Sequence, residues 1–178
     1  EYGLYNEDSF DIIIKDDEGY GEWWDKDLYQ DYKNDTLVLF NNENSSIDDF
    51  IYTFIHEVYP GHRHFFKNIK KQELCIDTSS ILIIEGYATF VEINTVDSIY
   101  ANNLRHRYAK IILSILNNET EALSFNSLFN VNQNIGFVES YYFGAFMIEY
   151  FIKNKFKSAK EFLAFISKNN LGEFFKLW

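Results

Sequence analysis

The stretch TFIHEVYPGHRHFF, residues 53–66, carries side chains whose types and spacing could bind a metal ion. On a regular helix, two histidines four residues apart share one face and can bind a single zinc ion, with a glutamate between them acting as a base. His56 is followed by Glu57, but the position four residues after His56 is Pro60, and the next histidine is His62. The stretch is either a metal site on a broken helix or a chance cluster on an ordinary one.

A metal site here requires a break in the helix. Residues four apart on an α-helix differ by about 40° around the axis, whereas residues six apart differ by about 240° and about 9 Å along it. Tetrahedral zinc needs ligand atoms only about 3.3 Å apart. Pro60 lacks the N–H that would bond to the His56 carbonyl, and Gly61 can adopt positive φ, so we expect a widened or terminated turn that returns His62 toward His56.

Glu85 is the best candidate for a third ligand. It lies within the apolar segment ILIIEGYATF, where an ionised carboxylate is costly to bury unless it is paired or bound to a metal. Glu85 lies 23 residues after His62, which is enough for a turn and an adjacent antiparallel helix. Gly86 would allow close backbone approach there. The alternative is an ion pair of Glu85 with Arg105 or Arg107.

The chain reads as one domain over residues 1–178, mainly α (α+β). Residues 1–45 are an irregular region with two predicted strands, FDIII and TLVLF, and residues 46–178 are helical. Helical periodicity and capping signals predict helices at 45–59, 77–96, 104–118, 119–129, 136–154 and 158–170. The first of them carries a predicted buried stripe: Ile47, Phe50, Ile51, Phe54, Ile55 and Val58. We expect Tyr142, Phe143 and Phe146 in the core.

Composition narrows the class of partner. The net charge of −11 repels phosphate backbones, which disfavours nucleic acid, and no apolar run of about 18 residues predicts a membrane span. The single cysteine, Cys75, cannot form an internal disulfide; we expect it to behave as a small hydrophobe and the protein to be cytoplasmic rather than secreted. The strand TLVLF and the residues after it either pair with an extended peptide or form an ordinary edge strand.

HEVYPGH followed by EGYATFVE resembles a large bacterial family of predicted zinc peptidases, a "domain of unknown function" family with the signatures HExxPGHH and EGWALYxE. RYAKIILSIL is similar to its RxxRLVxDxG helix, and ESYYFG to its SYxxG segment. The four matches fall in the family's order and cover roughly residues 50–150. Family members are usually much longer, so we expect this chain to be a fragment or a reduced version.

The resemblance implies a gluzincin-like, zinc-dependent metallopeptidase whose catalytic domain is zincin-like and helical and whose substrate is a peptide. His56, His62 and Glu85 would be the zinc ligands. Glu57 would activate a zinc-bound water for attack on the peptide bond. Tyr141, the tyrosine of the SYxxG segment, would donate to the developing oxyanion.

The sequence departs from the family pattern around these positions. The second consecutive histidine is replaced by Arg63, with His64 one place later, and the tryptophan of the second signature by Tyr87. Lys110 and Ser114 replace an arginine and an aspartate. The departures leave two other functions open: a zinc-binding or assembly module without activity, and a zinc hydrolase of non-peptide amides or esters. We expect His64 and His106 to be solvated or to support the site rather than to bind the metal.

Overall fold

A computed structural model of the chain describes residues 9–16, 21–24, 34–41, 46–68, 78–95 and 137–169. In this part of the chain the elements are β1 (Asp11–Lys15), β2 (Glu22–Trp24), β3 (Thr36–Phe40), α1 (Ile47–Glu57), α2 (His62–Asn68), α3 (Thr78–Thr95), α6 (Phe137–Asn154) and α7 (Ala159–Lys168). The predicted class, mainly α with a small sheet on the N-terminal side, is confirmed. Several predictions fall outside the described residues: the helices at 104–118 and 119–129, Cys75, Arg105, His106, Arg107, Lys110 and Ser114.

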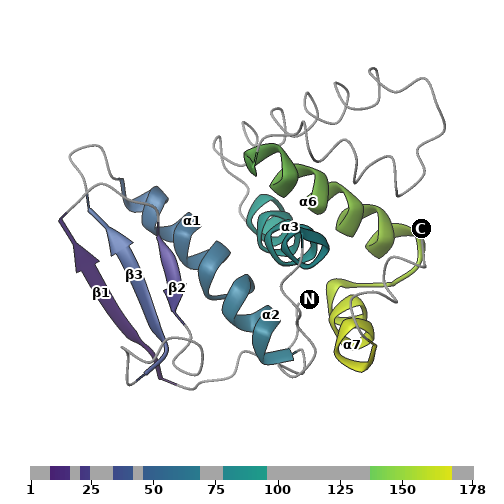
Figure 1. The fold of residues 1–178 in the computed structure, drawn as a ribbon, viewed down its shortest axis with the longest axis horizontal. Coiled ribbons are helices and arrows are strands. Elements are labelled where there is room, and N and C mark those ends of the chain that lie inside the picture. The colour runs from purple at the N-terminus through teal and green to yellow at the C-terminus, as the bar shows by residue number, and fades with distance from the viewer. Residues whose placement is uncertain are drawn as a thin grey trace.

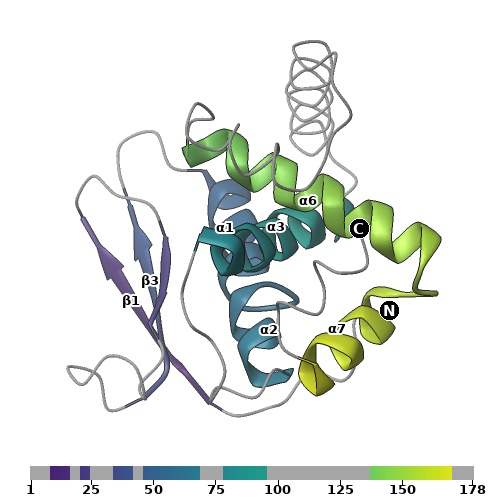
Figure 2. The same ribbon diagram turned by 45° about the vertical axis from the view of Figure 1, so that its right-hand side comes forward.

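The described elements are stacked in layers (Figure 1). The sheet lies on one side, α1 and α2 follow it, and α3 and α6 lie beyond them. Contacts join α1 to β2, β3 and α3, and α7 to α2 and α6. The view in Figure 2 shows the same order, with α1 and α2 between the sheet and α7. The segment that carries His56 and His62 is therefore the middle layer, with α3 against it.

The sheet has the strand order β1-β3-β2, with β1 parallel and β2 antiparallel to β3. Both predicted strands are present, whereas β2 was not predicted because its three residues are too few to show a period. The prediction that TLVLF forms an edge strand open to a peptide is wrong, because β3 is paired on both sides. Thr36 to Leu39 are all buried, so both faces of β3 are covered, which explains why this run is apolar without alternation.

Two predicted helix caps are confirmed. Ser46 begins α1 with a capping box, in which its hydroxyl accepts from the Asp49 N–H at 3.2 Å while Asp49 accepts from the Ser46 N–H at 2.8 Å. Ser158 begins α7 and accepts from the Glu161 N–H at 3.3 Å. Each cap satisfies a backbone donor that has no partner within its own helix, so each fixes the residue at which its helix starts.

The predicted buried stripe of α1 is only partly correct. Ile55 and Val58 are buried, but Ile47 and Ile51 are 77% and 45% exposed, and Tyr52 is buried in their place. The buried positions run from Tyr52, in the middle of α1, to its C-cap Val58. Sequence periodicity shows which face of a helix is apolar, but it does not show how far along the helix its neighbours extend.

The α3 and α6 helices form the centre of the main hydrophobic core, to which α7 and Phe65 of α2 contribute. A Cβ atom on Gly86 would lie 2.4 Å from the backbone of Gly144, so the predicted close backbone approach at Gly86 is confirmed. Tyr142 and Phe143 are buried and Phe146 packs against the core, as predicted. Although α3 is apolar on nearly all sides, none of the described helices is long and apolar enough to cross a membrane.

Candidate metal centre

The predicted break between His56 and His62 is present. The α1 helix ends at Glu57, and a new helix starts at His62 after the cis peptide bond between Tyr59 and Pro60. At the end of α1 the N–H groups of both Val58 and Tyr59 donate to the Phe54 carbonyl, at 2.8 and 3.2 Å, which widens the last turn. The α2 helix begins as the Phe65 N–H donates to the Gly61 carbonyl. Across this break α2 runs in roughly the same direction as α1 (Figure 1).

Gly61 is required in this turn for a reason other than the one predicted. Its φ lies outside the left-handed region, so the expectation of positive φ is wrong. A Cβ atom at this position would instead lie 1.7 Å from the carbonyl oxygen of His56 and 2.4 Å from that of Ile55. The backbone at Gly61 lies so close to the last turn of α1 that no side chain fits, and this close packing brings His62 next to His56.

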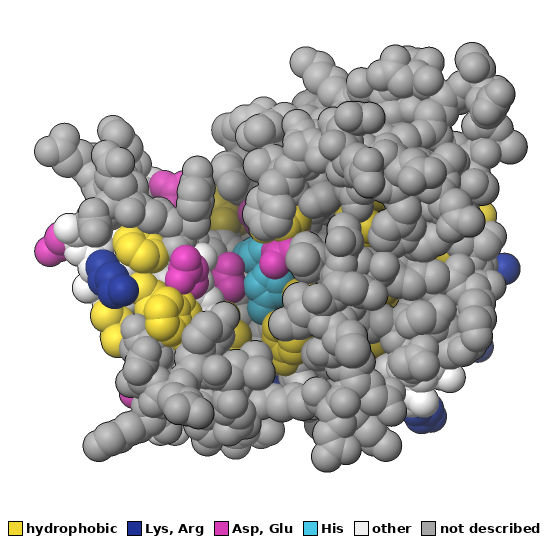
Figure 3. Space-filling view, in the orientation of Figure 1, with side chains coloured by type: hydrophobic (Ala, Val, Ile, Leu, Met, Phe, Trp, Pro, Cys, Tyr) yellow, Lys and Arg dark blue, Asp and Glu magenta, His cyan; other side chains and the backbone are white. Residues whose placement is uncertain are grey.

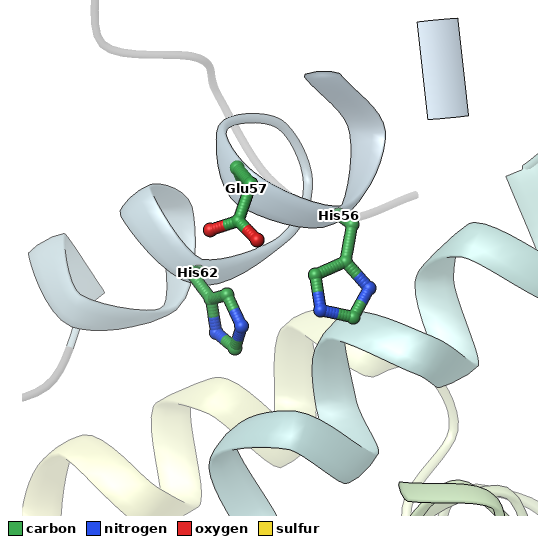
Figure 4. Close-up of side chains that lie close together, drawn as sticks. All are labelled: His56, Glu57 and His62. Carbon is green, nitrogen blue, oxygen red and sulfur yellow. The ribbon is translucent and has the colours of Figure 1, made fainter. Parts of the chain in front are cut away.

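The two imidazole rings meet as the metal hypothesis requires. Their centroids are 4.8 Å apart and the planes are nearly perpendicular, at 83°. Figure 4 shows both rings, with the Glu57 carboxylate beside them, on the side of α1 and α2 that faces α3. His56, Glu57 and His62 each offer one ligand atom, and these atoms lie within 4.8 Å of one another. This group could hold a metal ion.

Glu85 joins the two histidines from α3. Its Oε2 atom lies 3.5 Å from Nε2 of His56 and 3.1 Å from Nε2 of His62. Ligand atoms around tetrahedral zinc are separated by about 3.3 Å, and the two distances from Glu85 to the histidines are close to that value. The alternative ion pairs of Glu85 with Arg105 or Arg107 involve residues outside the described part of the chain.

The carboxylate of Glu57 is bound to the sheet rather than to α3. Its Oε2 accepts a hydrogen bond of 3.0 Å from the main-chain N–H of Trp23, in β2. Burial raises the pKa of Glu57, against the opposing effects of the charges on His62 and His56. A carboxylate of raised pKa is a stronger base, which suits proton transfer better than permanent ionisation does. The contact from Trp23 could not be predicted, because a main-chain donor is not tied to any residue type.

The donors of this site share a strongly held proton. Burial by itself lowers the pKa of His56, but hydrogen bonds to Glu85 and Glu92 outweigh it and raise the pKa to about 10. Burial by itself raises the pKa of Glu85, but hydrogen bonds from His56 and His62 outweigh it and lower the pKa to about 2. A divalent cation would compete with that proton, because histidine binds metals in its neutral form.

Tyr141 lies on α6, half-buried. Burial raises its pKa, and the negative charges of Glu85 and Glu57 raise it further. The phenol of Tyr141 is thus close enough to Glu85 and Glu57 to be affected by their charges. A phenol with a raised pKa keeps its proton at neutral pH and remains a hydrogen-bond donor.

Arg63 and His64, which follow His62 in the sequence, are both buried and pack against other parts of the protein. Arg63 is buried, its guanidinium lies over the rings of Phe10 and Trp23 at 5.3 Å from each centroid, and its Nε is 3.6 Å from Asp35. It therefore ties α2 to the sheet. His64 is also buried, so of the two predicted alternatives the solvated side chain is excluded and a supporting position remains; its ring packs edge-on against Tyr59. The group that could hold a metal among the described residues does not include His64.

Histidine and acidic side chains of the described part reach the surface together, beside a hydrophobic cluster (Figure 3). The donor set is thus partly open to a ligand from solvent. Comparison with protein-family models, with curated proteins and with solved structures found no match. The resemblance to the zinc peptidase family therefore remains a prediction, and the functional argument depends on the geometry of the site.

Proposed function

We propose that this protein is a zinc-dependent metallopeptidase, with His56, His62 and Glu85 as the metal ligands and Glu57 as the general base. The observation that carries the proposal is the position of the Glu85 oxygen, 3.5 and 3.1 Å from the two Nε2 atoms. Two imidazoles and one carboxylate are a donor set typical of catalytic zinc, which keeps a fourth position for a water molecule or a substrate. The half-buried Glu57 has a carboxylate oxygen within 4.8 Å of a ring nitrogen of both histidines.

The chemistry divides between the metal and the side chains. A zinc ion in this site supplies Lewis acidity, which lowers the pKa of water and polarises a carbonyl group. Glu57 accepts the proton of the attacking water as the new C–O bond forms, and transfers it to the leaving amine as the C–N bond breaks. Tyr141 keeps its proton and donates a hydrogen bond to the oxygen that becomes negative.

The position of β2 supports an extended peptide as the substrate. Among the described strands β3 is central, so β2 lies at one edge of the sheet that they form. Its Trp23 N–H contacts Glu57, so a peptide that extends along this edge passes the general base. Edge strands recognise extended peptides through main-chain hydrogen bonds, without requiring a particular sequence.

The test is hydrolysis of a mixed peptide library by the zinc-loaded protein, with a panel of non-peptide amides and esters measured alongside. We expect peptide cleavage, and a decrease in kcat of about 10²–10⁴-fold in Glu57→Gln, because general acid–base catalysis contributes that much. Glu149→Gln is the matched control: its parent residue pairs with Lys153 on α6, away from the ligands. A protein that binds one zinc per chain and cleaves no peptide contradicts the proposal.

A further inference from the structure

His56 is held from behind by a second carboxylate of α3. Its Nδ1 lies 3.0 Å from Oε2 of Glu92, and the two side chains are only 18% and 13% exposed. An ionised carboxylate only accepts hydrogen bonds, so Nδ1 must carry the proton of this contact. The other ring nitrogen, Nε2, then faces Glu85 at 3.5 Å.

We propose that Glu92 is a positioning residue, which fixes the ring and the tautomer of His56 so that Nε2 is presented to the metal. This inference rests on the proposed metal site, though not on peptidase activity. A ligating histidine whose other N–H donates to a carboxylate is oriented in advance and becomes a more basic ligand. In this chain Glu92 provides that carboxylate.

The spacing on α3 places both functions on one rigid surface. Glu85 and Glu92 are seven residues apart, which on an α-helix is about two turns and nearly the same direction. Between them lie Tyr87 and Val91, both fully buried, so the helix is fixed by its packing. Glu85 and Glu92 therefore keep fixed positions relative to each other, on either side of the His56 ring.

His62 provides an internal contrast. Its Nδ1 is buried and finds no hydrogen-bond partner among the described residues. Its ring instead lies against Phe66, at 6.4 Å between centroids, and against the edge of His56. The two histidines are thus oriented by different means: His56 by a hydrogen bond and His62 by packing. Removal of the Glu92 carboxylate should accordingly loosen only His56.

The test compares zinc affinity in the parent, Glu92→Ala, Glu92→Gln and the control Glu149→Gln, measured by competition with a chromophoric chelator. Loss of an outer-shell partner typically costs about 10–100-fold in metal affinity. We expect a loss of that size in Glu92→Ala and a smaller one in Glu92→Gln, whose amide oxygen can still accept the hydrogen bond. Glu149→Gln should bind zinc like the parent.

A spectroscopic measurement separates positioning from general destabilisation. In the zinc form of the parent, ¹⁵N-edited spectra of labelled histidine should show a downfield Nδ1–H proton for His56, which should move upfield in Glu92→Gln and disappear in Glu92→Ala. Zinc affinities within twofold of the parent in both variants would overturn the inference while the metal site itself stands. A parent that binds no zinc would overturn the metal site and this inference together.

Discussion

The two sides of the candidate site are built in opposite ways. His56 and His62 come from a chain that breaks between them, and they meet because the backbone at Gly61 packs directly against the end of α1. Glu85 and Glu92 come from one unbroken helix, and they align because seven residues make about two turns. Irregular backbone between α1 and α2 is needed to bring the two histidines together, whereas a regular helix, α3, is sufficient to align the two glutamates.

The glycines of the two sides reflect the same contrast. Gly61 admits a contact within the site segment itself, against the carbonyl of His56. Gly86, next to Glu85, admits a contact between α3 and the backbone of Gly144 on α6. The first glycine determines the geometry of the ligands directly. The second determines how closely the helix that carries Glu85 approaches the one that carries Tyr141.

Loss of a ligand should have the largest effect. His56→Ala, His62→Ala and Glu85→Ala should each lose most of the bound zinc, by more than the roughly 10–100-fold expected for an outer-shell change. His64→Ala serves as the control, because its ring packs against Tyr59 and lies outside the donor group of the described residues. Metal analysis after dialysis decides the matter. Zinc retained by His62→Ala and lost by His64→Ala would show that the ligands are wrongly assigned.

Addition of a methyl group at Gly61 and at Gly86 should have different effects on the two sides of the site. Gly61→Ala puts a Cβ atom against the His56 carbonyl and should reduce both zinc affinity and stability, whereas Gly86→Ala pushes α3 from α6 and should mainly reduce stability. Overpacking typically costs about 1–3 kcal/mol. Gly21→Ala is the milder control, because its Cβ meets the end of the Thr53 side chain rather than backbone. Thermal unfolding and zinc titration measure both quantities; parent-like zinc binding in Gly61→Ala would refute the steric account.

The helix caps should give the smallest effects and leave the metal site unchanged. Ser46→Ala and Ser158→Ala should each lower the free energy of unfolding by about 1 kcal/mol, through loss of the N-cap hydrogen bond. The hydrogen bonds from Ser46 also hold the pKa of Asp49 below its usual 3.8. That stabilisation is present above pH 3.8 and is lost as the pH falls through the lower, folded-state pKa. Denaturant titrations from pH 2 to 7 should show a smaller pH dependence in Ser46→Ala than in the parent, because only the backbone hydrogen bond to Asp49 remains.

Much of this arrangement could be predicted from the sequence, because it depends on local signals. Pro60 and Gly61 predicted the break, a long segment that is apolar on nearly all sides predicted α3, and the Ser-x-x-acid patterns predicted both caps. An acidic residue in an apolar run marked Glu85 as a residue in need of a partner. The structure brings it to the two predicted histidines.

The remaining features depend on contacts between distant segments. The bond from Trp23 to Glu57 joins residues 34 positions apart and uses a main-chain donor, so no residue type marks it. The central place of β3 depends on β2, whose three residues are too few to show a pattern. The exposure of Ile47 depends on where the neighbouring layers end. Sequence periodicity contains none of this information.

The central claim is that Glu85 binds the metal while Glu57, whose carboxylate also lies within 4.8 Å of the histidines, serves as the base. Zinc content per chain in Glu57→Gln and Glu85→Gln, measured beside the parent and Glu149→Gln, tests it most directly. An amide is a weak zinc ligand, so we predict one zinc per chain in Glu57→Gln and little zinc in Glu85→Gln. Loss of zinc in Glu57→Gln with retention in Glu85→Gln would contradict the account, and would show that His56, Glu57 and His62 hold the metal.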